Sequence, residues 1–266
     1  MFFHRAFTAD LWKGVIAIVR IPASITVRYA EVDAVDEYLS VSTTDGEFSA
    51  YIARPSTSPA PTIVVLQELF GINADLRTTC QELACQGYFA LCPDLFWRLQ
   101  RCVDLSDQSE AEWQKGLALY RSFNLDTGVS DIDATMQLGR GLPGATGRVG
   151  VMGFCLGGLM TFLTMARQGA DAGVVYYGGS TEKHLEEAPD IEDPLLVHLG
   201  ENDEYIPAPA RSAIISALAP NPLAKVFTYP GCRHAFARHH GAHYAPDAAA
   251  LANRRTADFF ATHLRA

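Results

Sequence analysis

The sequence lacks the features that mark several classes of protein. The longest apolar run near its N-terminus, residues 14–19, is far too short to cross a membrane, and no secretory signal pattern surrounds it. None of the six cysteines forms a Cys-x-x-Cys pair, so the usual spacing of zinc ligands is missing. There is no internal repeat and no low-complexity tract. We therefore expect no metal, no other cofactor and no association with membranes.

Basic residues are also scarce. The chain has 21 lysines and arginines against 30 aspartates and glutamates, and this formal net charge of −9 disfavours binding to nucleic acid or anionic lipid. An anionic substrate would then depend on local arginines. With 266 residues, 48% of them hydrophobic, the chain can bury a large core without disulfides. We expect a cytoplasmic monomer in which every cysteine except Cys155 is a small core residue.

Residues 1–36 are an N-terminal extension of uncertain structure, which we interpret as an accessory strand or helix or as an extension from an upstream start codon. An amphipathic targeting segment is the alternative. Residues 37–266 are predicted to form one α/β domain, because short apolar strands alternate with helices, the pattern of a mostly parallel sheet covered on both faces. The predicted strands are 38–42, 48–53, 62–66, 88–92, 149–154, 174–177, 195–199 and 226–229. The predicted helices are 74–86, 110–123, 126–138, 156–168, 209–218 and 246–263.

The strongest local motif is Gly-Phe-Cys-Leu-Gly at residues 153–157, which lies between a predicted strand and a predicted helix. This is the pattern of a nucleophile elbow with cysteine in place of serine. Glycines are needed because side chains two residues from the nucleophile would clash in so tight a turn. The start of the following helix also favours a thiolate at Cys155. Taken alone, the motif is equally consistent with a glycine-rich turn around a buried cysteine.

Two further residues lie just after predicted strands. Asp203 follows the strand 195–199, and His234 follows the strand 226–229. By itself Asp203 could form an Asx turn or a helix cap, and His234 could be a surface loop residue. In chain order, however, the three residues run nucleophile, acid, histidine, which is the order of the α/β-hydrolase fold. We therefore predict this fold, with Cys155, Asp203 and His234 as a catalytic triad.

Each member of this triad has a chemical role. Cys155 would attack a carbonyl carbon and form an acyl-enzyme, while His234 moves protons and Asp203 orients the imidazole. The backbone N–H of Leu156 would stabilise the oxyanion, because the residue after the nucleophile usually does. Glu68, which follows the strand 62–66, is either a base acting on the Cys155 proton or a solvated loop carboxylate. In the first case Leu69 N–H is a second oxyanion donor.

The chain from about residue 38 onward resembles the dienelactone hydrolases (carboxymethylenebutenolidases). Several ordered segments carry the resemblance: Gln-Glu-Leu-Phe-Gly-Ile-Asn at 67–73, Gly-Tyr at 87–88, Cys-Pro-Asp-Leu at 92–95, Gly-Phe-Cys-Leu-Gly-Gly at 153–158, Val-Tyr-Tyr-Gly at 175–178, Asp203 with Ile-Pro-Ala at 206–208, and Gly231 through His234 with Phe-Ala-Arg at 236–238. The resemblance implies hydrolysis of the lactone ring of dienelactone to maleylacetate, a step in the breakdown of catechols, including chlorinated ones.

The resemblance also implies how the site works. A glutamate at the position of Glu68 keeps the cysteine neutral until a substrate carboxylate displaces it, which protects the sulfur from oxidation. Two arginines, Arg98 and Arg238, would grip that carboxylate, because the guanidinium fork offers parallel donors. Tyr177, Phe70 and Trp97 are expected to line the pocket. The chain departs from the family pattern at Ala235, where the best-known members have a hydroxyl side chain.

Three other functions remain open at this stage. The first is a carboxylesterase or thioesterase acting on another small anionic acyl compound, because the same triad serves such reactions. The second is a ligand receptor without catalytic activity on a hydrolase fold, although a receptor has no use for a matched nucleophile and base. The third is a redox sensor based on Cys155, with Cys232 as a resolving partner.

Overall fold

The sheet begins with an antiparallel hairpin. The computed structural model describes residues 37–265, and in this part of the chain β1 (Glu37–Thr43) pairs with β2 (Gly46–Ala53). The hairpin turn is tight because Gly46 adopts a φ of 139°, and Thr43 Oγ1 donates to the Gly46 carbonyl at 3.0 Å. The predicted hairpin is thereby confirmed. The predicted extension, residues 1–36, lies outside the described residues, so its boundary stays a prediction.

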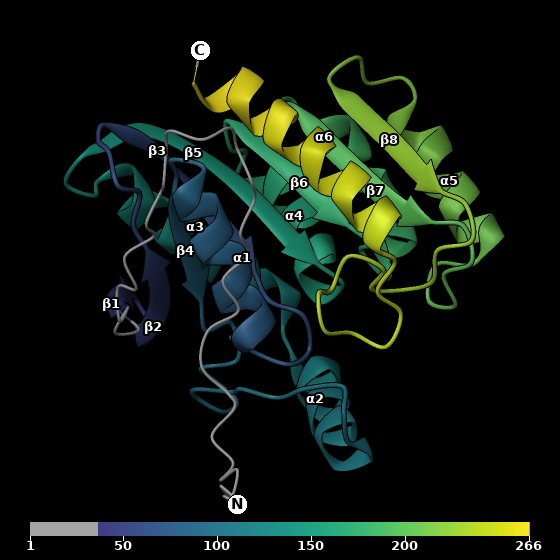
Figure 1. The fold of residues 1–266 in the computed structure, drawn as a ribbon, viewed down its shortest axis with the longest axis horizontal. Helices are drawn as coiled ribbons and strands as arrows, with labels where there is room; N and C mark the ends of the chain where they lie inside the picture. The colour runs from purple at the N-terminus through teal and green to yellow at the C-terminus, as the bar shows by residue number, and fades with distance from the viewer. Residues whose placement is uncertain (1–36, 266) are drawn as a thin grey trace, which may run out of the picture. The chain divides into compact units, whose positions relative to one another are not determined.

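The remaining strands of the described chain run parallel to one another, and β2 joins them through an antiparallel pairing with β4. They are β3 (Ala60–Leu66), β4 (Phe89–Pro93), β5 (Ala145–Phe154), β6 (Ala172–Tyr176), β7 (Leu195–Gly200) and β8 (Ala224–Tyr229). The spatial order is β1-β2-β4-β3-β5-β6-β7-β8 (Figure 1). Every residue of β3, β4, β6 and β7 is buried, as expected for strands covered on both faces.

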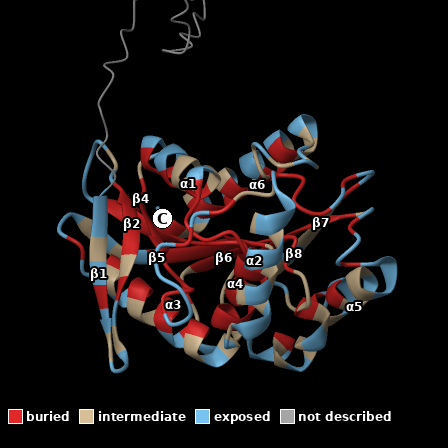
Figure 2. Ribbon diagram, turned by 90° about the horizontal axis from the view of Figure 1, so that it is seen from below, coloured by how far each residue is buried: buried red, intermediate tan, exposed pale blue. Residues whose placement is uncertain are grey.

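Helices cover both faces of this sheet. They are α1 (Ala74–Cys85), α2 (Glu110–Ser122), α3 (Leu125–Arg140), α4 (Leu156–Arg167), α5 (Ala208–Leu218) and α6 (Pro246–Leu264). Figure 2 shows α1 and α6 on one side of the strands and α3, α4 and α5 on the other. The first ten residues of α4 are all buried, which confirms the helix predicted to be apolar on nearly all sides. The predicted fold class, an α/β-hydrolase sheet with helices on both faces, is thus confirmed.

Local signals in the sequence explain where several helices begin and end. Asn73, Ser109 and Asn124 each precede a helix and accept a hydrogen bond from a backbone N–H three residues later. Gly87 follows α1 with a φ of 88°, a conformation that favours glycine where a helix ends. The two short 3₁₀ helices Thr181–Lys183 and Leu185–Asp190 were not predicted. No helix among residues 37–265 is both long and apolar enough to span a bilayer.

The expectation for the cysteines is only partly correct. Cys80, Cys92 and Cys232 are buried, but Cys85 and Cys102 are exposed. Cys85 is the last residue of α1, and Cys102 lies in a loop with a φ of 54°. The sequence pattern did not show which side of these segments faces solvent.

A histidine is buried within the sheet. His198 on β7 is fully buried, and its two ring nitrogens lie 3.1 Å from Thr256 Oγ1 and 2.8 Å from the Tyr229 hydroxyl. Burial, with a smaller contribution from the positive charge of Arg255, lowers the pKa of His198 to about 3. The imidazole is therefore neutral in the folded protein at neutral pH.

We predict that His198 makes the fold acid-sensitive. The unfolded chain binds a proton on this residue below pH 6.5, whereas the folded chain does so only near pH 3. Stability is thus lost as the pH falls through this window, by up to about 1.4 kcal/mol per pH unit from this group. In a His198→Gln variant, denaturant unfolding at several pH values should show a smaller decrease of the unfolding free energy as the pH falls. Parallel curves for the two proteins would contradict the prediction.

Candidate active site

The turn between β5 and α4 presents Cys155. Its backbone has φ 53° and ψ −111°, which is strained for a residue with a side chain, and its N–H donates to the Tyr176 carbonyl at 3.1 Å. A Cβ atom at Gly157 would lie 2.3 Å from the Leu66 carbonyl oxygen. One at Gly153 would lie 2.2 Å from the Gly157 carbonyl oxygen. Glycine is therefore required at both positions, as the motif predicts.

Asp203 and His234 meet at the same edge of the sheet. Asp203 follows β7 and His234 follows β8, and Asp203 Oδ2 lies 2.8 Å from His234 Nδ1. The other oxygen of Asp203 accepts hydrogen bonds from the backbone N–H groups of Tyr205 and Ile206. Asp203 and His234 are both buried. The carboxylate is therefore held in one orientation and directs the second ring nitrogen of His234 away from itself.

The sulfur of Cys155 is close enough to His234 to change its protonation. Burial alone would lower the pKa of His234, but the negative charge of the Cys155 sulfur and hydrogen bonds with Asp203 and Cys155 raise it to about 10. The proton is therefore held on the imidazole when the sulfur is a thiolate. The sulfur of Cys155 and the imidazole of His234 are therefore electrostatically coupled.

Two tyrosines flank the imidazole. The ring centroids of Tyr177 and Tyr205 lie 5.2 and 4.8 Å from that of His234, both edge-on. Tyr177 is fully buried and its hydroxyl has no hydrogen-bond partner among the described residues, whereas Tyr205 is 51% exposed. Tyr177 was predicted to line the pocket, but Tyr205 was missed. Its position two residues after Asp203 was the available signal.

Glu68 and Arg238 form an ion pair close to this group. Arg238 Nε lies 2.6 Å from Glu68 Oε2, and both side chains are at least nine-tenths buried. The guanidinium also lies over the ring of Phe70, 4.9 Å from its centroid. Glu68 Oε1 is buried without a partner in the described chain, and the charges of Glu68, Arg238 and Cys155 all act on the Tyr177 hydroxyl. These predicted residues therefore lie close to one another.

The segments that carry the predicted oxyanion donors also meet here. Leu156 is the first residue of α4, and Leu69 follows Glu68 in the loop after β3. The close approach of Gly157 to the Leu66 carbonyl shows that the elbow packs directly on the end of β3. The role of these two N–H groups stays a prediction.

Arg98 and Trp97 do not join this group. Arg98 pairs with Asp131 on α3 and with Asp45 in the β1–β2 turn, the latter at 2.7 Å. Trp97 stacks on Phe48 with 5.5 Å between centroids, and its indole N–H donates to Asp131 at 2.9 Å. Of the two arginines predicted to bind the substrate carboxylate, Arg238 lies beside Glu68, whereas Arg98 pairs with other carboxylates in the described part of the chain. Arg98 and Trp97 are held by side chains from distant segments of the chain, namely Asp45, Asp131 and Phe48.

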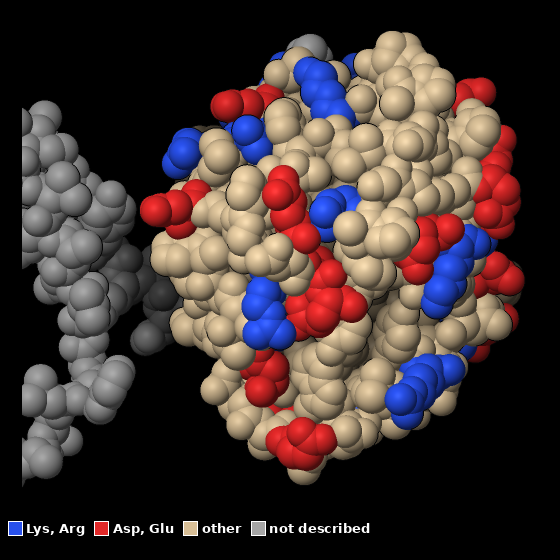
Figure 3. Space-filling model, turned by 90° about the vertical axis from the view of Figure 1, so that its right-hand side faces the viewer, with Lys and Arg blue, Asp and Glu red and all other residues tan. Residues whose placement is uncertain are grey.

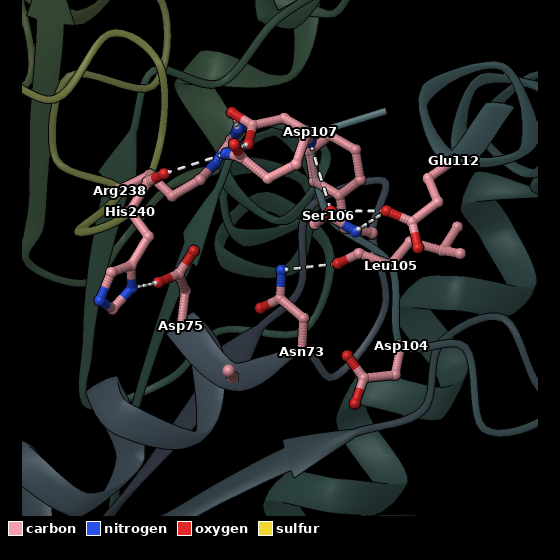
Figure 4. Close-up of a pocket in the computed structure, with 12 residues that line it drawn as sticks. Asn73, Asp75, Asp104, Leu105, Ser106, Asp107, Glu112, Arg238 and His240 are labelled. Carbon is pink, nitrogen blue, oxygen red and sulfur yellow. Dashed lines mark hydrogen bonds and ion pairs between the residues drawn. The ribbon is translucent and has the colours of Figure 1, made fainter. Parts of the chain in front are cut away.

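The net charge of the chain disfavours an anion. The formal net charge is −9, and on the face shown in Figure 3 acidic side chains cluster near the middle with single basic side chains beside them. A pocket of about 250 Å³ lies beside Arg238, with Phe70, Asp107 and His240 among its lining residues (Figure 4). Cys155 and His234 do not line it, so this pocket adjoins the triad without containing it.

Comparisons with known proteins show the family of this chain. The sequence profile of the Dienelactone hydrolase family matches residues 48–264. The carboxymethylenebutenolidase of Pseudomonas putida is 40% identical over 226 residues, which cover 85% of this chain and 96% of that protein. Carboxymethylenebutenolidase 1 of Cupriavidus pinatubonensis is 37% identical over 216 residues, covering 81% and 92%.

Solved structures share the fold. A protein from Klebsiella pneumoniae superposes with a TM-score of 0.74 at 27% identity, over 85% of this chain and 98% of that one. A dienelactone hydrolase from Anabaena variabilis superposes with a TM-score of 0.64 at 18% identity, over 86% and 98%. At the latter identity the similarity concerns the fold alone.

We predict that the elbow does not tolerate a methyl group at Gly157. Because the new Cβ would overlap the Leu66 carbonyl, Gly157→Ala should lower the free energy of unfolding by about 1–3 kcal/mol, as overpacked sites do. Gly179→Ala is the matched control, since a Cβ there meets no atom within 4 Å. Its unfolding free energy should change by less than about 0.5 kcal/mol. Equal denaturation midpoints for both variants would refute the steric argument.

Proposed function

We propose that this chain, which belongs to the dienelactone hydrolase family, opens the lactone ring of dienelactone to give maleylacetate. Membership of the family makes it a carboxylic ester hydrolase. The observation that carries the proposal is the meeting of Cys155, His234 and Asp203 at one edge of the sheet, beside a buried arginine. This arrangement suits a small ester that carries its own carboxylate.

The first half of the reaction would form an acyl-enzyme. The Cys155 thiolate attacks the lactone carbonyl carbon, and the carbonyl oxygen becomes an oxyanion near the N–H groups of Leu156 and Leu69. When this intermediate collapses, the ring C–O bond breaks and the ring oxygen leaves as an enolate. The imidazolium of His234 supplies the proton that this group takes up on its way to a ketone.

The second half would return the enzyme to its starting state. One water molecule gives a proton to His234 and adds to the thioester carbonyl. The thioester C–S bond then breaks, which releases a carboxylic acid and leaves the Cys155 thiolate beside protonated His234. The acid ionises, and its proton leaves to solvent. Asp203 holds the imidazole in the same orientation throughout, because its own geometry is fixed by two backbone N–H groups.

Glu68 would gate this reaction. Its carboxylate is held by Arg238 through one oxygen, while the other oxygen has no partner among the described residues. A substrate carboxylate arriving at Arg238 would compete with Glu68 for the same donors. The displaced Glu68 would then accept the Cys155 proton while His234 is already protonated, so that the reactive thiolate forms mainly when substrate is present. Glu68 returns this proton to the sulfur when the product leaves.

A second candidate function is hydrolysis of other small esters or thioesters. The observation in its favour is the position of Arg98, which pairs with Asp45 and Asp131 and so leaves Arg238 as the arginine next to Glu68. With fewer cations at the site, the preference for an anionic substrate is weaker. The ratio of kcat/KM for dienelactone to that for p-nitrophenyl acetate separates the two functions.

We predict that Cys155→Ala abolishes dienelactone turnover, because no other group at the site can form the acyl-enzyme. The measurement is the loss of ultraviolet absorbance of dienelactone with purified protein, and the expected loss of rate is at least about 10⁴-fold. Cys85→Ala is the control, because that thiol is exposed at the end of α1. Substantial turnover by Cys155→Ala would rule out the mechanism.

We also predict opposite effects of Glu68→Gln on turnover and on alkylation. Without the carboxylate that accepts the thiol proton, turnover should fall by about 100-fold. Removing a negative charge near sulfur should nevertheless favour the thiolate, so iodoacetamide should modify resting Cys155 faster. Glu110→Gln, at the exposed start of α2, is the control. A wild-type Cys155 that is already fully thiolate without ligand would show that Glu68 is no gate.

A further inference from the structure

Arg238 is held by two carboxylates, and one of them has no place in the mechanism above. Asp107 Oδ2 lies 2.6 Å from Arg238 Nη1, while Glu68 Oε2 lies 2.6 Å from Nε of the same guanidinium. The Asp107 side chain is 11% exposed and also accepts a hydrogen bond from the Ala242 N–H at 3.3 Å. Figure 4 shows Asp107 and Arg238 together on the wall of the pocket. Asp107 therefore grips Arg238 independently of Glu68.

The other acidic side chains of this pocket have different partners. Asp75 pairs with His240 at 2.6 Å, Asp104 pairs with Arg77 at 3.0 Å, and Glu112 accepts from the Ser106 hydroxyl at 2.5 Å. Asp107 is thus distinguished from its acidic neighbours by direct contact with Arg238. This contact connects the pocket to the group around Cys155.

The charges at Arg238 do not balance. One guanidinium faces the carboxylates of Glu68 and Asp107, so the group is negative by one before any substrate arrives. When a substrate carboxylate replaces Glu68 and Glu68 takes the Cys155 proton, the group gains one further negative charge. The replacement of one carboxylate by another leaves the charge at Arg238 unchanged, but the proton that Glu68 takes leaves one extra negative charge on the group. Asp107 repels this extra charge. An anion consequently binds more weakly than Arg238 alone would allow.

Lactone hydrolysis makes this repulsion directional. The substrate enters with one carboxylate, and ring opening consumes one water and generates a second carboxylate and a proton. The product therefore carries one more negative charge than the substrate. A fixed negative charge beside Arg238 therefore weakens binding of the product more than binding of the substrate.

We propose that Asp107 is a positioning residue with two effects: it keeps Arg238 aimed at the substrate carboxylate while Glu68 moves away, and its charge speeds release of the dianionic product. This inference rests on the function proposed above. It implies that Asp107 makes the site bind a dianion less tightly than a monoanion.

The test compares how Asp107→Asn and Asp104→Asn bind two probes, crotonate, a monoanion, and maleate, a dianion. Asparagine at residue 107 keeps an oxygen that can accept from Arg238 but removes the charge. Isothermal titration calorimetry should give a crotonate Kd about tenfold lower for Asp107→Asn than for the wild type, with a larger factor for maleate. Asp104→Asn should leave both Kd values within about twofold, because that side chain is half exposed and paired with Arg77.

Several outcomes overturn the inference. The Kd values could be unchanged in Asp107→Asn, or could fall equally in Asp104→Asn. The Kd values for crotonate and maleate could fall by the same factor, or the wild type could bind neither probe. Progress curves with dienelactone give a separate readout: in Asp107→Asn, inhibition by accumulated product should be stronger relative to KM. If the wild type does not open dienelactone, the proposed function fails, but the Kd values still decide the role of Asp107.

Discussion

The turn that carries Cys155 requires glycine where the end of β3, the end of β5 and the start of α4 meet. Gly157 faces the Leu66 carbonyl at the end of β3, and Gly153 faces Gly157 itself, so both contacts leave no room for a Cβ atom. This close approach brings the elbow and the Glu68 loop together, and it places the sulfur at the edge of the sheet where Asp203 and His234 also arrive. The chemistry of the site thus begins from a steric constraint on the backbone.

Electrostatics then divides the site into two coupled groups. In the first, the Cys155 sulfur and the Asp203 carboxylate raise the pKa of His234, in spite of its burial. In the second, Arg238 is shared between Glu68 and Asp107. The buried Tyr177 hydroxyl is affected by charges of both groups. Burial and the charges of Glu68 and Cys155 raise its pKa, while the Arg238 charge opposes this. A change of protonation in one group is therefore felt in the other.

The sequence was sufficient for the fold and for the meeting of the triad, because each of Cys155, Asp203 and His234 follows a strand of a parallel sheet. Arg98 also follows a strand, but the direction of its long side chain is decided by Asp45 and Asp131, which come from a hairpin and a helix far away in the chain. Asp107 was missed for the same reason. Its contact with Arg238 depends on how loops pack on each other, which local patterns do not encode.

The loop between β4 and α2 holds Asp107, while the proposed nucleophile Cys155 and its partners belong to other loops. Side-chain substitutions in this loop can therefore change the pocket, while β5, β7 and β8, which position Cys155, Asp203 and His234, stay the same. The same separation is useful for protein engineering: a library confined to the β4–α2 loop would vary which acyl compounds enter and leave, while the covalent chemistry stays constant.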